Sequence, residues 1–255
     1  MKNICVKIFV VLSFIAMVMV NFLANRLPIN GRSTGVISDS YPNLFAPAGV
    51  TFSIWGLIYL LLALYTLYQF ILSRKNKSKE NFLRNINTLF IYTSLANISW
   101  IFAWHYDFIG LSVLIMATLL ILLIKITRII YKEQLTSGEK FLISTPFSIY
   151  FGWITVAAIA NTTVFLVSIN WNGFGITDFI WTSIILLAGA LIGILMIKKD
   201  KNIAYALVLI WAYFGILFKH VSVNGFNQEY QSIIITLIVC LALFIFFTGK
   251  LLIKK

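Results

Sequence analysis

Acidic residues are scarce in this chain of 255 residues. Eight Asp and Glu residues stand against twenty Lys and Arg residues, and charged residues make up 11% of the sequence. Soluble domains carry about 25% charged residues. Because 60% of the residues are hydrophobic and the mean hydropathy is +0.94, the polar side chains cannot cover a water-soluble globule. The composition therefore predicts a protein whose solvent is the lipid bilayer.

Cysteine and histidine are rare as well. Cys5 and Cys240 lie in apolar runs at opposite ends of the chain, so they cannot form a disulfide framework or a metal site of familiar spacing. His105 and His220 could ligate haem iron, but each stands alone at the edge of an apolar run. That position is more typical of a polar surface residue than of an axial ligand. A phosphate-binding glycine loop, an H-E-x-x-H helix and a convergent Ser/His/Asp set are also missing.

Long apolar runs take the place of these features. A run of about 20 apolar residues must satisfy its own backbone hydrogen bonds in lipid, and a helix does so. The sequence predicts an all-α polytopic membrane bundle with about eight transmembrane helices, at 4–24, 48–72, 86–106, 108–131, 141–168, 176–197, 203–219 and 231–253. The first run could be a signal peptide, because Lys2 and Lys7 precede it. Phe22 occupies a position where cleavage requires a small residue, so an uncleaved helix is expected.

The net charge of +12 is concentrated in short connections between the apolar runs, which argues against nucleic-acid binding. The connections alternate between rich and poor in Lys and Arg. The alternation predicts that both termini face the cytoplasm. The rich segments hold Arg74, Lys75, Lys77, Lys79 and Arg84; Arg128, Lys132 and Lys140; Lys198, Lys199 and Lys201; and Lys250, Lys254 and Lys255.

Ionisable residues are missing from the centres of the second, third, fifth and seventh runs. Enzymes and ion-coupled transporters usually place such groups within the membrane. Lys125 and Arg128 lie toward the cytoplasmic end of the fourth run and can extend to the interface. The protein is therefore not expected to be an enzyme.

One segment joins a proline-marked loop to an aromatic helix face. Residues 41–49 contain two prolines, and Phe52, Trp55 and Tyr59 follow at offsets of three and four. These offsets place the three rings on one face of a helix. The loop at 25–47 carries apolar residues that need cover, so it is expected to fold over the mouth of the bundle. Together they indicate a pocket for a flat apolar ligand.

Two further runs place aromatic and amide residues at a similar depth. On the third run, Asn97 lies three residues before Trp100, and Trp104 lies four residues after it. On the fifth run, a spacing of four places three residues on one stripe, namely Trp153, Ala157 and Asn161. A structural interpretation stays open. Tryptophans gather at membrane interfaces, small residues mark close helix packing, and asparagines bond across helices. By that interpretation the interfacial belt would hold Trp104, Trp171 and Trp181.

These residues resemble the translocator protein family, also called tryptophan-rich sensory proteins (TspO/MBR), whose members are five-helix membrane bundles. The family's second helix has the form Pro-x-x-x-Phe-x-x-x-Trp-x-x-x-Tyr, and its third helix carries Asn-x-x-Trp. Its fifth helix carries Trp-x-x-x-Ala-x-x-x-Asn. The matching residues here, with a different spacing from the proline to the phenylalanine, are Pro47, Phe52, Trp55 and Tyr59; Asn97 and Trp100; and Trp153, Ala157 and Asn161.

The resemblance covers residues 4–168, and the short family members have no counterpart of the last three helices. The chain therefore looks like a longer bacterial branch, in the cytoplasmic membrane, with a five-helix bundle at 1–168 and a three-helix extension at 169–255. The resemblance implies a sensor or translocator for a flat hydrophobic molecule such as a porphyrin. The implied binding residues are Phe45, Pro47, Phe52, Trp55, Tyr59, Asn97, Trp100, Trp104, Trp153, Ala157 and Asn161.

The implied partners are the lipid bilayer and the hydrophobic ligand, and dimerisation is common in such proteins. No cofactor is expected to be required, and porphyrin or haem would be a ligand. A permease subunit, or a scaffold whose tryptophans only pack, is the alternative. A polar cavity lined also by the last three helices would favour the permease. A compact aromatic pocket within the first five would favour the sensor.

Overall fold

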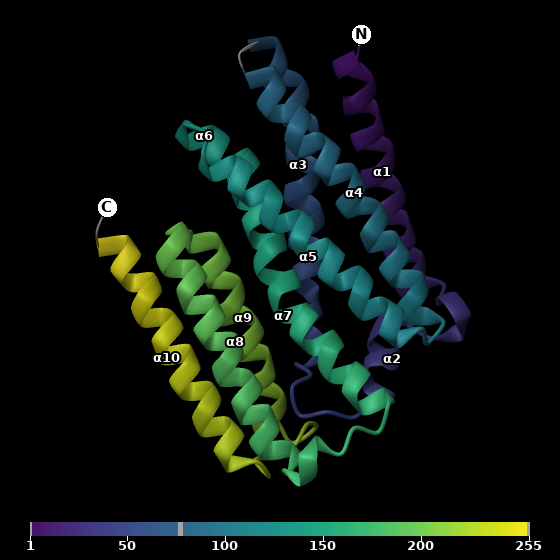
Figure 1. Cartoon of the computed structure of the whole chain (residues 1–255), viewed down its shortest axis with the longest axis vertical. Coiled ribbons are helices and arrows are strands. Elements are labelled where there is room, and N and C mark those ends of the chain that lie inside the picture. Colours follow the sequence, from purple (N-terminus) through teal and green to yellow (C-terminus); the bar gives the residue numbers. More distant parts are fainter. Residues whose placement is uncertain (1, 76–78, 254–255) are drawn as a thin grey trace.

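The computed structural model describes residues 2–75 and 79–253, and these ranges form helices and connections without a strand (Figure 1). Lys77, Lys254 and Lys255 of the predicted charge pattern lie outside the described residues. Eight helices in the described ranges are long and apolar enough to cross a membrane. They are α1 (Lys2–Arg26), α3 (Ile54–Lys75), α4 (Glu80–His105), α5 (Ile109–Tyr131), α7 (Thr145–Ser168), α8 (Asp178–Asp200), α9 (Ile203–Val221) and α10 (Gln231–Ile253). The predicted all-α fold with eight spans is confirmed.

The outer surfaces of these helices are apolar. On α8, for example, Leu187, Leu191 and Leu195 recur every four residues and are each about half exposed. A soluble bundle would place polar residues on such a stripe, whereas lipid favours leucine. The molecule is therefore an integral membrane protein surrounded by the bilayer.

Short elements fill the connections. The loop after α1 holds two 3-10 turns, at Ile29–Gly31 and Gly49–Ser53, and the helix α2 (Thr34–Asp39). The fifth span begins earlier than expected, because α6 (Ser137–Glu139) and a π-helical turn at Lys140–Ser144 run directly into α7. Thr136 and Glu139 form a capping box there, and Lys79 lies 2.7 Å from the Glu139 carboxylate. These polar contacts explain why the helix can start outside the apolar run.

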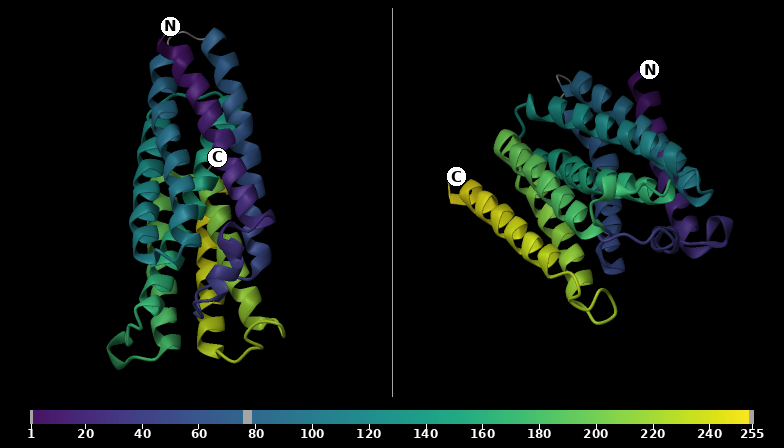
Figure 2. Two further views of the ribbon diagram at one scale, coloured as in Figure 1. Left: turned by 90° about the vertical axis from the view of Figure 1, so that its right-hand side faces the viewer. Right: turned by 60° about the horizontal axis from the view of Figure 1, so that its bottom comes forward.

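Helix α7 lies at the centre of the bundle. Helices α1, α4, α5 and α7 pack in that order, and α3 packs against α7 and α1. On its other side α7 contacts α9, which packs against α10, and α10 also contacts α8. Figure 2 shows α10 at the edge of the molecule. Helices α1, α3, α4, α5 and α7 thus form one group, and α8, α9 and α10 form a second. The two groups meet mainly along α7 and α9. The predicted domain division at 168/169 stays a prediction.

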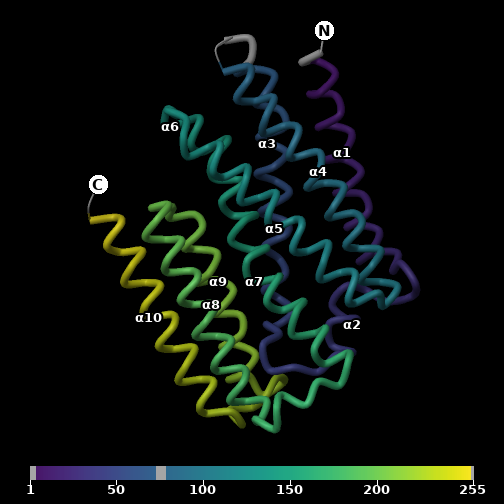
Figure 3. The backbone as a smooth tube through the Cα atoms, in the orientation of Figure 1, coloured from purple at the N-terminus to yellow at the C-terminus, as the bar shows by residue number. Residues whose placement is uncertain are grey.

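Both termini lie at the same end of the bundle, together with the α3–α4 and α8–α9 connections (Figure 3). The opposite end, which we call the α2 end, holds α2 and the α7–α8 and α9–α10 connections (Figure 1). This arrangement is required of a chain that crosses a bilayer an even number of times. The side of the membrane that each end faces stays a prediction from the Lys and Arg pattern.

Contacts between the two groups are close. A Cβ added to Gly152 of α7 would lie 3.0 Å from Cβ of Val208 on α9. Near the end that holds the termini, Arg128 of α5 forms an ion pair with Asp200 of α8. Arg128 is thus paired within the protein as well as placed near the interface. Asn202 donates to the Ser148 hydroxyl at 2.7 Å, which joins the start of α9 to α7.

Candidate functional site

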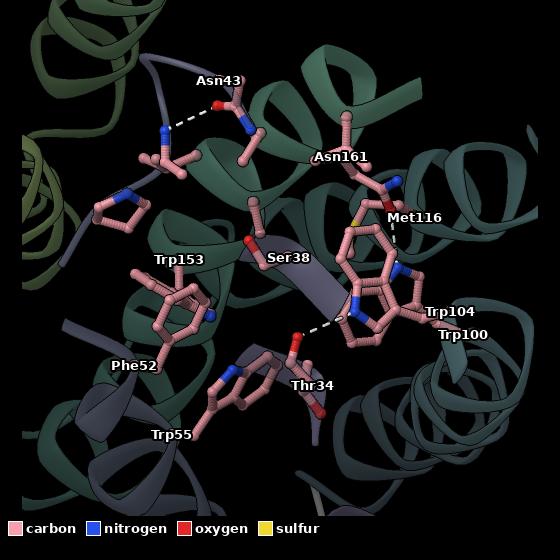
Figure 4. A pocket seen from close by; sticks show the side chains of 16 residues that line it. Thr34, Ser38, Asn43, Phe52, Trp55, Trp100, Trp104, Met116, Trp153 and Asn161 are labelled. Carbon is pink, nitrogen blue, oxygen red and sulfur yellow. Dashed lines mark hydrogen bonds between the residues drawn. The ribbon is translucent and has the colours of Figure 1, made fainter. Parts of the chain in front are cut away.

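A cavity lined mainly by aromatic and small apolar residues opens beneath α2, between α3, α4, α5 and α7 (Figure 4). We call it the aromatic cavity, and its volume is about 70 Å³. Every residue that lines it lies between positions 34 and 164. The last three spanning helices therefore contribute no lining residue among those described.

The aromatic cavity brings together eight of the eleven residues that the sequence implicated. These eight are Pro47, Phe52, Trp55, Trp100, Trp104, Trp153, Ala157 and Asn161. Three others lie elsewhere. Phe45 is fully buried in the core, Tyr59 stacks on Trp55 without lining the cavity, and Asn97 is fully buried. Convergence in one cavity does not test whether these side chains bind a ligand, so their roles stay predictions.

The expected cover over the bundle mouth is present. Thr34 and Ser38 of α2 line the cavity with Asn43, Ala46 and Pro47 of the following loop. The Asn43 side-chain oxygen accepts hydrogen bonds from the backbone N–H groups of Phe45, at 3.1 Å, and Ala46, at 2.9 Å. This Asx-type turn holds the loop in place without help from a regular element.

The wall opposite α2 is the predicted stripe on α7. Asn161 sits at its end, where its side-chain oxygen accepts from Trp100 Nε1 at 2.7 Å. The Asn161 amide nitrogen donates to Ser112 Oγ of α5 at 2.8 Å. One amide therefore fixes a tryptophan of α4 and links three helices, while Ala157 leaves room above it. Helical periodicity placed these residues on one face, and the structure brings the α4 indole to the same face.

The indoles form two groups across the cavity (Figure 4). Trp100 and Trp104 are stacked, with ring centroids 5.4 Å apart. On the other side Trp153 meets Phe52 edge-on at 5.8 Å and Trp55 edge-on at 6.3 Å. Stacked and edge-to-face pairs are the favoured arrangements of aromatic rings. Aromatic side chains therefore line two sides of the cavity.

Two of these indoles differ in how their N–H groups are used. Trp104 Nε1 donates to the Thr34 carbonyl at 3.2 Å and Trp104 is 4% exposed, so it is not the lipid-facing belt residue of the alternative interpretation. Trp153 is 3% exposed, and its Nε1 has no hydrogen-bond partner among the described residues. A buried N–H without a partner is costly, and a ligand acceptor would satisfy it.

Asn97 has a structural environment. Its side-chain oxygen accepts from Asn21 of α1 at 2.6 Å, and its nitrogen lies 3.3 Å from the Tyr150 hydroxyl of α7. The three polar groups satisfy one another within the bundle, as buried polar groups require. Asn97 thus joins α1, α4 and α7, as the structural interpretation expected of a membrane asparagine.

A second space, the lateral groove, runs between α1 and α3 beside the aromatic cavity and has a volume of about 540 Å³. Four residues line both spaces, namely Thr34, Phe52, Trp55 and Trp100. Tyr59 and Phe22 line the groove alone, and Phe22 is 60% exposed on α1. The groove therefore opens toward the lipid, and a wall of three aromatic side chains and one threonine separates it from the aromatic cavity.

Sequence reasoning missed several lining residues. Met116 of α5 and the α7 series Val156, Ala160 and Val164 line the aromatic cavity, as do Thr34 and Ser38. Val156, Ala160 and Val164 recur every four residues, and this spacing could have identified them in the sequence as a second stripe on α7. Met116 carried no comparable signal, because most of the residues around it in α5 are apolar.

Both histidines are fully buried, contrary to the expectation that they lie on the polar surface. His105 Nδ1 lies 2.8 Å from the Ile101 carbonyl oxygen, and His220 Nε2 lies 2.9 Å from the Leu44 carbonyl oxygen. A carbonyl oxygen only accepts, so each of these ring nitrogens carries the hydrogen. Helix α9 thus holds the loop that leads into the aromatic cavity. The described residues contain no group of three or more His, Cys, Asp or Glu residues placed to hold a metal ion.

Comparison with known proteins identifies a family. A family model described as TSPO-like protein matches residues 7–249. The match continues through the last three helices, beyond the 4–168 range in which the sequence motifs were found. No curated protein and no solved structure matches the chain. Because the family model covers nearly the whole sequence, the chain belongs to the TSPO-like protein family.

Proposed function

We propose that this protein is a membrane sensor or translocator that binds a flat hydrophobic molecule of the tetrapyrrole class in the aromatic cavity. The observation that carries the proposal is the convergence of Trp55, Trp100, Trp104 and Trp153 from three helices on one cavity under α2. Flat aromatic ligands gain about 1 kcal/mol per well-placed aromatic contact beyond the burial of their surface. The unpartnered Trp153 N–H favours a ligand that also carries a hydrogen-bond acceptor.

The volumes of the aromatic cavity and the lateral groove indicate how such a ligand would enter. Pockets for drug-sized ligands measure about 300–1,000 Å³, and the aromatic cavity, at about 70 Å³, is smaller. The lateral groove falls within that range at about 540 Å³. We infer that the ligand enters from the lipid through the groove and displaces Phe52 and Trp55, two of the four residues in the shared wall. The bound state then joins both spaces.

The permease alternative has less support. A permease needs a polar route lined by several spans, whereas the aromatic cavity has lining residues from positions 34–164 and an apolar wall. Binding without catalysis is the better proposal, because no titratable side chain lines the cavity among the described residues. A scaffold would not need the buried, unpartnered N–H of Trp153.

Substitution of a cavity tryptophan tests the proposal. Purified protein in lipid nanodiscs is titrated with protoporphyrin IX, and binding is followed by the absorption band of the porphyrin. Trp153→Ala should weaken binding about tenfold or more, since it removes an aromatic wall and the free donor. Trp181→Ala, outside the cavity, should leave binding within about twofold. Equal losses in both variants, or no loss in either, would favour the scaffold.

A further inference from the structure

A third space, open to the surface at the α2 end, is lined by α7, α8 and the connections that flank α8 and join α9 to α10. Its volume is about 460 Å³, and it lies among the α7–α8 connection, the start of α8, the α9–α10 connection and residues 42–44. We call it the vestibule. Its aromatic lining residues are Trp171, Phe179, Trp181, Phe226 and Tyr230. It shares Asn43 with the aromatic cavity and is otherwise lined by different residues.

The aromatic walls of the vestibule are fixed by the connection between α7 and α8. The rings of Trp171 and Trp181 lie 5.1 Å apart, and Trp181 Nε1 donates to the Gly173 carbonyl at 2.7 Å. Gly173 has φ +60°, and a Cβ there would lie 2.9 Å from the Trp181 ring. Only glycine allows this approach. A tryptophan that only lies at the lipid interface needs no such constraint. The contacts with Gly173 therefore fix the position of Trp181 next to Trp171.

The charge at the vestibule is negative, in a chain whose net charge is +12. Asp178 lines it, and Glu229 adjoins Tyr230. Burial is the largest cause that raises the pKa of the Tyr230 hydroxyl, followed by the charge of Glu229, a hydrogen bond to Glu229 and the charge of Asp178. No lysine or arginine among the described residues lines the space.

The other carboxylates at this end already have cationic partners. Asp107 pairs with Arg32, and Asp39 lies 3.8 Å from Lys219. Lys219 also lies 5.5 Å from the centre of the Phe226 ring, but Lys219 itself does not line the vestibule. Within the described part of the chain, Asp178 and Glu229 form no ion pair. The vestibule therefore has one lining carboxylate without an ion-pair partner, Asp178, beside aromatic side chains.

We propose that the vestibule binds an organic ammonium group, with Trp171 and Trp181 as aromatic walls and Asp178 as the counter-charge. Aromatic faces attract quaternary ammonium groups through the ring quadrupole, and a nearby carboxylate adds to the attraction. The ammonium group could belong to a free amine or to a lipid headgroup, since both carry this chemistry. The proposal does not depend on tetrapyrrole binding in the aromatic cavity.

Calorimetric titration with a charged ligand and its neutral isostere tests the proposal. The full-length protein is placed in nanodiscs of phosphatidylglycerol, which has no ammonium group, and titrated with choline and with 3,3-dimethylbutan-1-ol. These two molecules have nearly the same shape and differ in charge. Choline should bind at least about tenfold more tightly. Equal affinity for both, or no heat from choline at millimolar concentration, would overturn the proposal.

Two variants and one control locate the site. Asp178→Asn removes the charge at constant size, and Trp171→Leu removes the aromatic face, so each should weaken choline binding about fivefold or more. Asp39→Asn removes an exposed carboxylate outside the vestibule and should leave the affinity unchanged. Thermal unfolding of each variant reports whether the bundle stays folded. Choline binding that survives both vestibule substitutions would refute the assignment of the site.

The lipid composition then separates the two sources of the ammonium group. In phosphatidylcholine nanodiscs, a headgroup that occupies the vestibule would compete and abolish the choline signal. Unchanged choline binding would identify a free amine as the ligand class. The two results therefore distinguish a lipid headgroup from a free amine as the source of the ammonium group.

Discussion

At the residue scale, Asn161 connects the packing of the bundle to the shape of the aromatic cavity. Its amide accepts from Trp100 and donates to Ser112, and it is 3% exposed. Loss of the amide would leave the buried Trp100 N–H without its partner, whereas the Ser112 hydroxyl would still donate to the Ile109 carbonyl. Such an unsatisfied group costs about 1–3 kcal/mol.

We therefore expect Asn161→Leu to lower the free energy of unfolding in detergent by about 2 kcal/mol or more. The stacked Trp100 and Trp104 should also lose their fixed orientation, which near-ultraviolet circular dichroism would report. Thr162→Val is the control, because Thr162 is exposed and its hydroxyl bonds only within α7. A variant that unfolds like the wild type would show that the amide has no such role.

The sequence predicted which residues share a helical face, and it could not predict depth or partner. Trp153, Ala157 and Asn161 were found by their spacing alone. Asn97 carried the same kind of signal, but Asn21 of α1 and Tyr150 of α7 turn it into a packing residue. Those partners lie 76 and 53 residues away, so no local pattern could reveal them.

At the scale of elements, α9 holds the loop that covers the aromatic cavity. The Gly215 carbonyl accepts from Ala48 N–H at 3.0 Å, and Trp211 Nε1 donates to the Thr51 carbonyl at 2.9 Å. His220 binds the Leu44 carbonyl from the same helix. The extension thus has a role at the cavity without lining it. The sequence motifs gave no sign of this role, because α9 and the segment at 44–51 are both mainly apolar and no local pattern pairs them.

Gly215 is the closest point of this contact. A Cβ added there would lie 2.0 Å from Thr51 Oγ1, so Gly215→Ala must move α9 away from the loop. Overpacking of this kind costs about 1–3 kcal/mol. We expect lower thermal stability and porphyrin binding weakened about fivefold, as the cover loosens.

Gly56→Ala is the matched control, because a Cβ at Gly56 of α3 meets nothing within 4 Å. Pairing Gly215→Ala with Thr51→Ala should recover part of the lost stability, since the closest atom is removed. If Gly215→Ala behaves like Gly56→Ala, the contact between α9 and the loop does not control the cavity.

At the scale of the whole molecule, the apolar runs and the Lys and Arg pattern predicted the architecture well. Lengths of about 20 apolar residues fixed the number of helices, because a span must satisfy its own backbone in lipid. The neighbours of each helix could not be predicted in the same way. Contacts such as α7 with α9 depend on small residues, including Gly152, whose role is visible only when the partner is known.

The orientation in the membrane follows from the same pattern and can be measured. The α3–α4 connection and the α7–α8 connection lie at opposite ends of the bundle (Figure 1). Topology reporters fused after Lys79 and after Asn172 should therefore report opposite sides, with the fusion after Lys79 in the cytoplasm. Both reporters on one side would contradict the eight-span topology, and reversed sides would contradict the orientation.

Saturable porphyrin binding to the wild-type protein is the most direct test of the central claim. Protoporphyrin IX is titrated into nanodiscs that contain the protein and into empty nanodiscs of the same lipid, and tryptophan quenching and porphyrin absorption are recorded together. The account predicts one saturable site per chain, with quenching that empty discs cannot show. A linear, unsaturable signal equal to partition into empty discs would contradict it.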